Sequence, residues 1–200
     1  MAAACGNGVI QLYQADTLMP DRTLEHHNDA VTCVKFSPDS RQYLASGGYD
    51  GQVVIVDIYD YDEYLRIPPE DYSTVFCVRF SRDSTKIAFT ADNTIRVWDI
   101  VEKRHIATLK GHPKPVRAVV FSPDGKFLYS GAQDRCIRVW DLTENEEIAI
   151  LEGHRDFVLR LDIHPEGKFL VSCSSDKNVR VWNLEEKTPL SVMSGHTDQV

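Results

Sequence analysis

The three tryptophans of this chain recur at a fixed interval of 42 residues. Trp98 and Trp140 each end the segment Ile-Arg-Val-Trp, and Trp182 ends the closely similar Val-Arg-Val-Trp. One interval earlier, Val56 ends the segment Val-Val-Ile-Val. A period of this length is typical of an array of similar small units and not of one irregular domain.

Each unit carries the pattern of four short β-strands. A valine begins the first strand, and a turn such as Ser-Pro-Asp-Gly at 122–125 precedes the second, because proline presets φ in a tight turn. The Ile-Arg-Val-Trp segment alternates and is rich in β-branched residues, which favours a third strand. Fourth strands are expected at 64–67, 105–109, 147–151 and 190–193. No segment has a convincing helical period, so the unit is predicted to be a blade of a β-propeller.

Two dipeptides recur in order along the chain. Gly-His stands at 111–112, 153–154 and 195–196, and Trp-Asp stands at 98–99 and 140–141. In these motifs the whole chain resembles the WD-repeat (WD40) propeller family. The resemblance implies an all-β fold: a WD40-type β-propeller, as a partial ring of four whole four-stranded blades plus incomplete blades at both ends.

The period also predicts the blade boundaries. We expect the end of a blade at 1–25, whole blades at 26–67, 68–109, 110–151 and 152–193, and the start of another at 194–200. Because propellers close into rings, this count suggests a fragment of a longer protein. An open ring exposes a blade face, so the 200-residue chain alone is expected to be unstable or self-associating.

Composition narrows the class of protein. The formal net charge of −8 argues against a general nucleic-acid binder, which usually has a basic excess. No apolar run is long enough to cross a bilayer, and no signal peptide is legible, so membrane insertion is not expected. Five cysteines without a C-x-x-C pair suggest buried thiols in a reducing compartment. We therefore expect an intracellular protein, cytoplasmic or nuclear.

Two consecutive units contain Ser, His and Asp at matching positions, which is the composition of a catalytic triad. The family resemblance implies instead a structural tetrad, in which Trp, Ser, His and Asp form a buried hydrogen-bond chain. A buried tryptophan brings an N–H that needs an acceptor, and two near-identical sets in adjacent repeats fit a structural role better than catalysis. The expected tetrads are His112, Ser130, Asp134 and Trp140, and His154, Ser172, Asp176 and Trp182.

The first two whole units have incomplete tetrads. In the first, Val56 takes the place of Trp; in the second, Ala88 takes the place of Ser and Asp71 that of His. These two blades are therefore expected to be looser than the next two. The sequence also lacks G-x-G-x-x-G, a P-loop, H-E-x-x-H and paired C-x-x-C motifs, so no catalytic residue, cofactor or metal site is expected.

Family resemblance places three positions of each blade on the face near the central channel. Residues there that hold a blade together should repeat from unit to unit, whereas residues that bind a partner need not. The predicted partner-binding residues break the repeat and belong largely to types that dominate interface energetics: Tyr49, Phe76, Arg117, Gln133 and Phe157. The alternative is that these aromatic rings only pack between blades.

Three functional classes remain open. The leading hypothesis is a non-enzymatic scaffold or adaptor that presents a propeller face to partner proteins or peptides. A substrate-recognition subunit of a ubiquitin ligase is an alternative, although Trp-Asp-x-Arg is absent at 98–101 and 140–143. A reader of basic, histone-like tails is a variant of the scaffold hypothesis, suggested by the acidic, tyrosine-rich segment 57–72, whose simpler interpretation is a solvated loop. The third class is an enzyme. An enzyme would need a cluster of titratable groups at the channel, and none is legible.

Overall fold

The computed structural model describes residues 1–39, 43–69 and 73–200. Within these ranges the chain forms β-strands and no helix, in five antiparallel sheets. The first sheet has three strands: β1 (Ala2–Ala4), β2 (Val9–Tyr13) and β3 (Pro20–Glu25). In the same part of the chain, no helix has the length and apolar character to cross a bilayer.

The other four sheets have four strands each, and we name them blades I to IV. Blade I comprises β4 (Val31–Phe36), β5 (Tyr43–Gly48), β6 (Val53–Asp57) and β7 (Glu63–Ile67). Blade II comprises β8 (Val78–Phe80), β9 (Lys86–Ala91), β10 (Thr94–Asp99) and β11 (Arg104–Lys110). Blade III comprises β12 (Val116–Phe121), β13 (Phe127–Ala132), β14 (Ile137–Asp141) and β15 (Glu146–Leu151). Blade IV comprises β16 (Val158–Ile163), β17 (Phe169–Ser174), β18 (Asn178–Asn183) and β19 (Thr188–Ser194).

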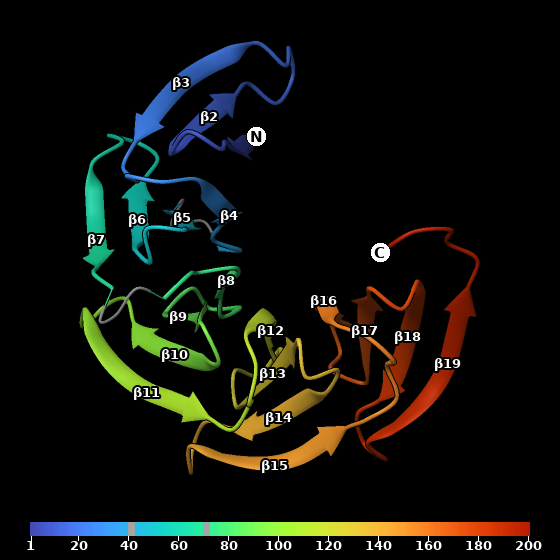
Figure 1. Cartoon of the computed structure of the whole chain (residues 1–200). Helices are drawn as coiled ribbons and strands as arrows, with labels where there is room; N and C mark the ends of the chain where they lie inside the picture. Colours follow the sequence, from blue (N-terminus) through green and yellow to red (C-terminus); the bar gives the residue numbers. More distant parts are fainter. Residues whose placement is uncertain (40–42, 70–72) are drawn as a thin grey trace.

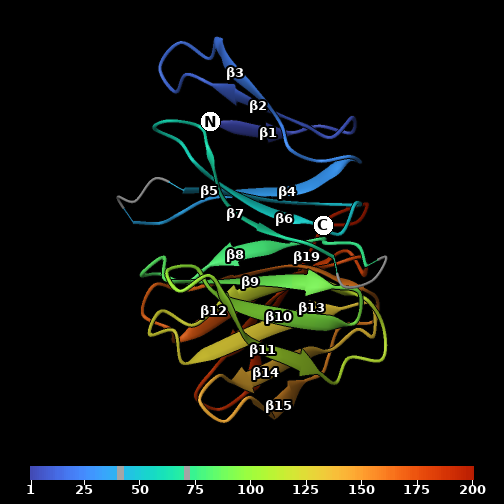
Figure 2. The same ribbon diagram turned by 90° about the vertical axis from the view of Figure 1, so that its left-hand side faces the viewer.

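The five sheets follow one another around an open arc (Figure 1). The first strands of the blades, β4, β8, β12 and β16, lie on the concave inner side, and the fourth strands lie on the outer edge. Seen from the side, successive sheets stack face to face as layers (Figure 2). The predicted fold is confirmed: the chain is an all-β, partial β-propeller with incomplete blades at its ends.

The hydrophobic core is divided among the spaces between consecutive sheets. One cluster joins the first sheet to blade I through Ile10 and Leu44, and the next joins blades I and II. Further clusters lie between blades II and III and between blades III and IV. Because each blade buries its faces only against its neighbours, stability is a sum of nearest-neighbour interfaces.

A glycine on the second strand lets the next blade approach closely. A Cβ on Gly131 would stand 2.5 Å from Val158 Cγ1, the valine that begins the next blade, and Gly47 meets Val75 in the same way. Real Cβ atoms are not found so close to a neighbouring carbon. The blades are therefore spaced by the absence of a side chain at this position.

The substitution Gly131→Ala is expected to lower the free energy of unfolding by about 1–3 kcal/mol, because the added methyl overpacks the interface between blades III and IV. Urea denaturation followed by tryptophan fluorescence measures the change. Gly6→Ala is the matched control, since nothing lies within 4 Å of a Cβ at that position. Equal stability of the two variants would contradict this account of blade spacing.

A β-bulge on the first strand shapes the inner side of three blades. The pairing register shifts between Val116 and Ala118 in blade III, so Arg117 has no opposite residue. Corresponding shifts leave out Thr32 in blade I and Leu159 in blade IV. Bulges re-aim a side chain away from the sheet face, and the bulged residues Thr32 and Arg117 line one common hollow.

Candidate functional site

The tetrad residues of blade III form one continuous hydrogen-bond chain. Trp140 Nε1 donates to Ser130 Oγ over 2.8 Å, and Ser130 Oγ lies 2.8 Å from His112 Nε2. His112 Nδ1 lies 2.7 Å from Asp134 Oδ2. The serine hydroxyl has one proton and accepts from the tryptophan, so it donates to Nε2, and the imidazole carries its proton on Nδ1, facing the carboxylate.

Blade IV repeats this arrangement at the corresponding positions. Trp182 Nε1 donates to Ser172 Oγ over 2.8 Å, Ser172 Oγ lies 2.7 Å from His154 Nε2, and His154 Nδ1 lies 2.9 Å from Asp176 Oδ2. Burial is the main cause that lowers the pKa of His154, against the opposing attraction of the carboxylate. Burial alone would raise the pKa of Asp176, but hydrogen bonds from backbone amides and from His154 outweigh it and lower the pKa to about 2.

In both blades the hydrogen bonds link Ser to His and His to Asp, as in a catalytic triad, but the serine is inaccessible. Ser130 and Ser172 are both 0% exposed, and each oxygen also accepts the tryptophan N–H. A nucleophile must reach a substrate carbonyl. In this geometry the chain of hydrogen bonds satisfies buried polar groups and ties the strands of one blade to the loop before it.

Stability is expected to fall as the pH is lowered from 7.5 to 5.5. The pKa of His154 is lowered in the folded chain, so the unfolded chain binds the proton more readily below about pH 6.5. The stabilisation that comes from the neutral, buried His154 is therefore complete above that pH, and it is lost as the pH falls toward the pKa of His154 in the folded chain. Denaturation curves at the two pH values measure it. His154→Asn should reduce the pH slope, and the exposed His164→Asn should keep it; an unchanged slope in His154→Asn would contradict this assignment.

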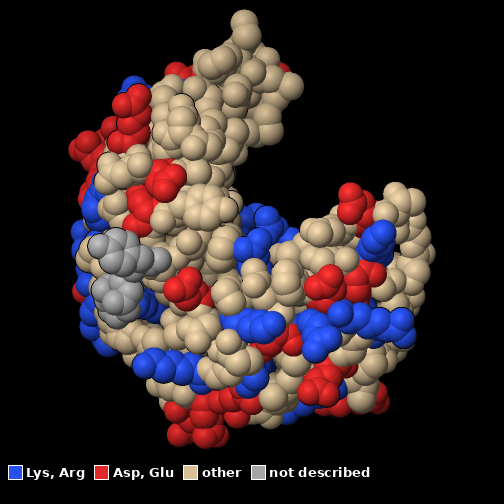
Figure 3. Space-filling model, in the orientation of Figure 1, with Lys and Arg blue, Asp and Glu red and all other residues tan. Residues whose placement is uncertain are grey.

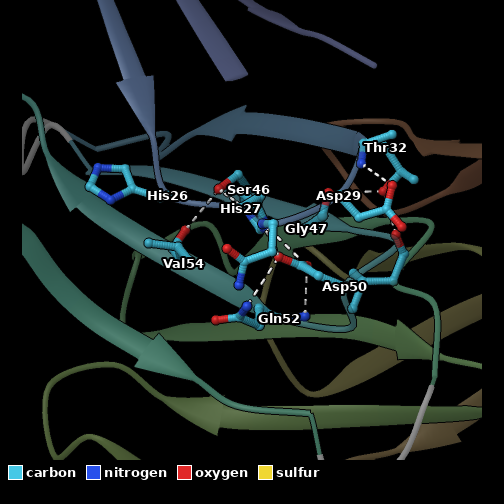
Figure 4. A network of polar contacts seen from close by, with 12 residues as sticks. His26, His27, Asp29, Thr32, Ser46, Gly47, Asp50, Gln52 and Val54 are labelled. Carbon is cyan, nitrogen blue, oxygen red and sulfur yellow. Dashed lines mark hydrogen bonds and ion pairs between the residues drawn. The ribbon is translucent and has the colours of Figure 1, made fainter. Parts of the chain in front are cut away.

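Blade I contains the same chain of hydrogen bonds, except that no tryptophan takes part in it. His27 Nε2 lies 2.8 Å from Ser46 Oγ, and His27 Nδ1 lies 3.0 Å from both carboxylate oxygens of Asp50 (Figure 4). Val56 fills the tryptophan position and is buried, and Ser46 Oγ instead lies 3.4 Å from Val54 O. The three polar side chains thus remain paired where no indole is present.

Blade II differs because its second hairpin is one residue shorter. Ala91 pairs with Thr94 across a turn of two residues, and the residue opposite Trp98 is Ile87. In blade III the residue opposite Trp140 is Leu128, two residues before Ser130. Two residues after Ile87 stands Phe89, which therefore occupies the position of the serine in blade II. The expectation that Ala88 occupies the serine position was therefore wrong, since counting by 42 does not register the shortened turn.

Trp98 has lost its acceptor as a result. Phe89 offers no oxygen, and Trp98 Nε1 is buried without a hydrogen-bond partner among the described residues. The histidine position, expected at Asp71, lies outside the described residues. The first strand of this blade is also short, because β8 comprises only residues 78–80.

Amide hydrogen exchange is therefore expected to be faster in residues 31–99 than in residues 116–183. An unsatisfied buried donor and a short inner strand both lower the free energy of local opening. Exchange measured by mass spectrometry on the intact chain tests this, with the peptides of blades III and IV as the internal reference. Equal protection in the two halves would show that the missing acceptor is compensated elsewhere.

Three of the predicted face residues meet at the mouth of the concave side. The rings of Tyr49 and Phe76 pack edge to face with centroids 6.2 Å apart, and the guanidinium of Arg117 lies 3.9 Å above the Phe76 ring. They come from blade I, the loop before β8, and the bulge of β12. We call this row the Tyr49–Phe76–Arg117 ladder. It lines a hollow of about 280 Å³ together with Val31, Thr32 and Arg160.

The other two predicted residues lie apart from the ladder. Gln133 and Phe157 line a second hollow of about 480 Å³ between blades III and IV, which contains none of the ladder residues. Phe157 is 39% exposed, and the backbone N–H of Gln133 donates to Pro115 O over 2.9 Å. The predicted face is therefore two neighbouring surfaces, not one.

Sequence reasoning missed Arg160, which lines the ladder hollow from β16. Its position, two residues after the valine that begins the first strand, holds Cys33, Cys77 and Ala118 in the other blades. A long cationic side chain where the other repeats have small residues breaks the period. Departure from the repeat, which marks Tyr49, Phe76 and Arg117, therefore marks Arg160 as well.

Sequence reasoning also missed Thr90, which positions Phe76. Its buried hydroxyl accepts hydrogen bonds from the amides of Phe76 over 2.8 Å and Cys77 over 3.1 Å. Together with the backbone hydrogen bond from Thr90 N to Cys77 O over 3.0 Å, these bonds hold the segment just before β8 against β9. The segment that carries the central ring of the ladder is thus held by a side chain from β9.

The acidic, tyrosine-rich segment lies elsewhere. Its described part, 57–69, includes β7 on the outer edge, where Tyr61 stacks under Arg22 at 4.1 Å and Tyr64 under Lys103 at 4.1 Å. It lines neither hollow, and its residues 70–72 lie outside the described residues. Acidic side chains are prominent on the outer rim, whereas basic side chains appear in the concavity (Figure 3). Within the described ranges, no three His, Cys, Asp or Glu side chains form a metal-binding group.

Comparison with known proteins agrees with this geometry. The family model described as WD domain, G-beta repeat matches residues 19–57, 65–99, 103–141 and 145–183, which is most of the chain. The chain belongs to the WD-repeat family.

Individual WD-repeat relatives match over part of their length. The chain is 32% identical to WD repeat-containing protein SL1-17 of Schistosoma mansoni, over 63% of this chain and 41% of that protein. It is 32% identical to nuclear distribution protein PAC1 of Coccidioides posadasii, over 68% of this chain and 31% of that protein. It is 24% identical to E3 ubiquitin-protein ligase COP1 of Arabidopsis thaliana, over 52% of this chain and 15% of that protein. The chain therefore spans less than half the length of these relatives.

Proposed function

We propose that this WD-repeat chain is a non-enzymatic scaffold or adaptor that binds partner proteins or peptides through the Tyr49–Phe76–Arg117 ladder. The observation that carries the proposal is the convergence of these three side chains, from three successive units of the repeat, on one open hollow. Aromatic and arginine side chains at such positions dominate binding energy at protein interfaces.

Exposure supports a binding role over simple packing between blades. Tyr49 is 53% exposed, although it contacts Phe76. Leaving this much of an aromatic ring in water forgoes burial that a core residue would gain. The hollow containing Phe157 and Gln133 is the natural second contact, since it lies between blade III, which carries Arg117, and blade IV.

A second candidate is a substrate-recognition subunit of a ubiquitin ligase. The similarity to E3 ubiquitin-protein ligase COP1 favours it, although that similarity covers only 52% of the chain. The described cysteines are all free thiols, which agrees with an intracellular location, cytoplasmic or nuclear, under either candidate.

Affinity purification with mass spectrometry tests the proposal. Partners captured by the tagged chain are compared with those captured after Tyr49, Phe76, Arg117 and Phe157 are all changed to Ala. Loss of specific partners is expected, with wild-type circular dichroism as the check on folding. Tyr59→Ala is the matched control, because this exposed tyrosine lies on the outer segment. If every partner survives the fourfold change, the face is not the binding site; recovery of ubiquitin-ligase subunits would favour the second candidate.

A further inference from the structure

Two arginines share the ladder hollow without an acidic partner. Arg117 projects from the bulge of β12 and Arg160 from β16, and no carboxylate lines the hollow. Arg117 stacks on Phe76, and Arg160 donates to the backbone oxygen of Leu159 over 3.0 Å. Among the described residues, neither guanidinium forms an ion pair.

The basic character extends along the concave side. An adjoining hollow of about 280 Å³ shares Thr32, Phe76 and Arg160 with the first, and adds Lys35 and Arg79. No carboxylate lines this hollow either. Although the net charge of the chain is −8, the electrostatic potential is therefore positive at these two hollows on its inner surface. Figure 3 shows basic side chains inside the concavity.

In the unbound protein, the charged guanidinium of Arg117 is destabilised by its surroundings in the ladder hollow. Burial lowers the pKa of Arg117, and the neighbouring charge of Arg160 lowers it further, against an opposing interaction with Tyr49. Both effects penalise the charged guanidinium, which nevertheless stays protonated. A bound anion would remove the repulsion and supply the missing hydrogen-bond acceptors.

We propose that the ladder hollow binds an acidic segment of a partner protein, in which Asp or Glu carboxylates pair with Arg117 and Arg160 while an apolar side chain lies on Phe76 and Tyr49. The planar guanidinium groups fit carboxylates, and the positive field steers an acidic chain toward the concavity. This inference rests on the proposed scaffold function and names the chemistry of its partner. It reverses the charge of partner that the acidic segment 57–72 suggested.

A random dodecapeptide phage library, selected against the 200-residue chain, supplies the probes. The selected peptides are expected to be enriched in Asp and Glu, and their fluorescein-labelled forms should bind more weakly as salt is raised. The double variant Arg117→Gln, Arg160→Gln is expected to weaken them about tenfold or more, since close charge pairs across an interface show substantial coupling. Arg104→Gln is the matched control, because it removes an exposed arginine from the outer edge.

The outcomes separate this inference from the proposed function. Acidic peptides that lose affinity in the double arginine variant and keep it in Arg104→Gln support the inference. Neutral or basic peptides that depend on Phe76 overturn it and leave the scaffold function standing. Acidic peptides that bind both arginine variants equally well also overturn it. Peptides whose affinity is unchanged by every ladder substitution count against both the inference and the proposed scaffold function. A selection that yields no binding peptide does the same.

Discussion

Replacing Ser130 by alanine is expected to lower the free energy of unfolding by about 2–5 kcal/mol, because two buried polar groups lose their partner at once. Ser130 Oγ accepts from Trp140 Nε1 and donates to His112 Nε2, and it is 0% exposed. Alanine provides neither function at this fully buried position. Urea denaturation with linear extrapolation measures the loss.

Ser46→Ala provides the matched comparison within the same molecule. In blade I no tryptophan occupies the corresponding position, so only His27 Nε2 loses its partner. The expected loss is about 1–3 kcal/mol, roughly half that of Ser130→Ala. Equal losses in the two blades would show that the indole bond contributes nothing, and that the tetrad is not a cooperative unit.

Phe76→Ala is expected to weaken the binding of a captured partner about thirtyfold or more, the range of a central hot spot. Phe76 is the middle of the ladder: its ring contacts Tyr49 on one side and Arg117 on the other. Removing it eliminates the platform and leaves both neighbours free to move. Fold stability should change less, since the side chain is only half-buried and Thr90 continues to hold the backbone. Biolayer interferometry with the partner measures the affinity.

Phe157→Ala tests whether the two hollows act together. Because Phe157 lies outside the ladder hollow, its removal should cost less affinity than the removal of Phe76. Tyr59→Ala on the outer edge should leave affinity unchanged. A larger effect from Phe157 than from Phe76 would move the centre of the binding site to the hollow between blades III and IV.

The repeating part of the molecule was accessible from the sequence. Trp140 and Trp182 keep their distance from Ser130 and Ser172 in sequence and in space, because strand pairing within one blade is local and its turns have equal length. The same reasoning failed in blade II. There a turn shorter by one residue moved Phe89 to the serine position, and the constant spacing of tryptophans concealed the change.

The sequence by itself determined the period, the class of fold, the blade strands and the positions that depart from the repeat. These follow from alternation, turn residues and spacing, all of which act within about one unit of the chain. Only the tertiary structure decided that Arg160 lines the hollow of the Tyr49–Phe76–Arg117 ladder, that Phe157 does not, and that the described part of the acidic segment lies on the outer edge. The reason is physical: side chains from different blades meet according to bulges and the stacking of sheets around the arc, and neither is recorded in the period.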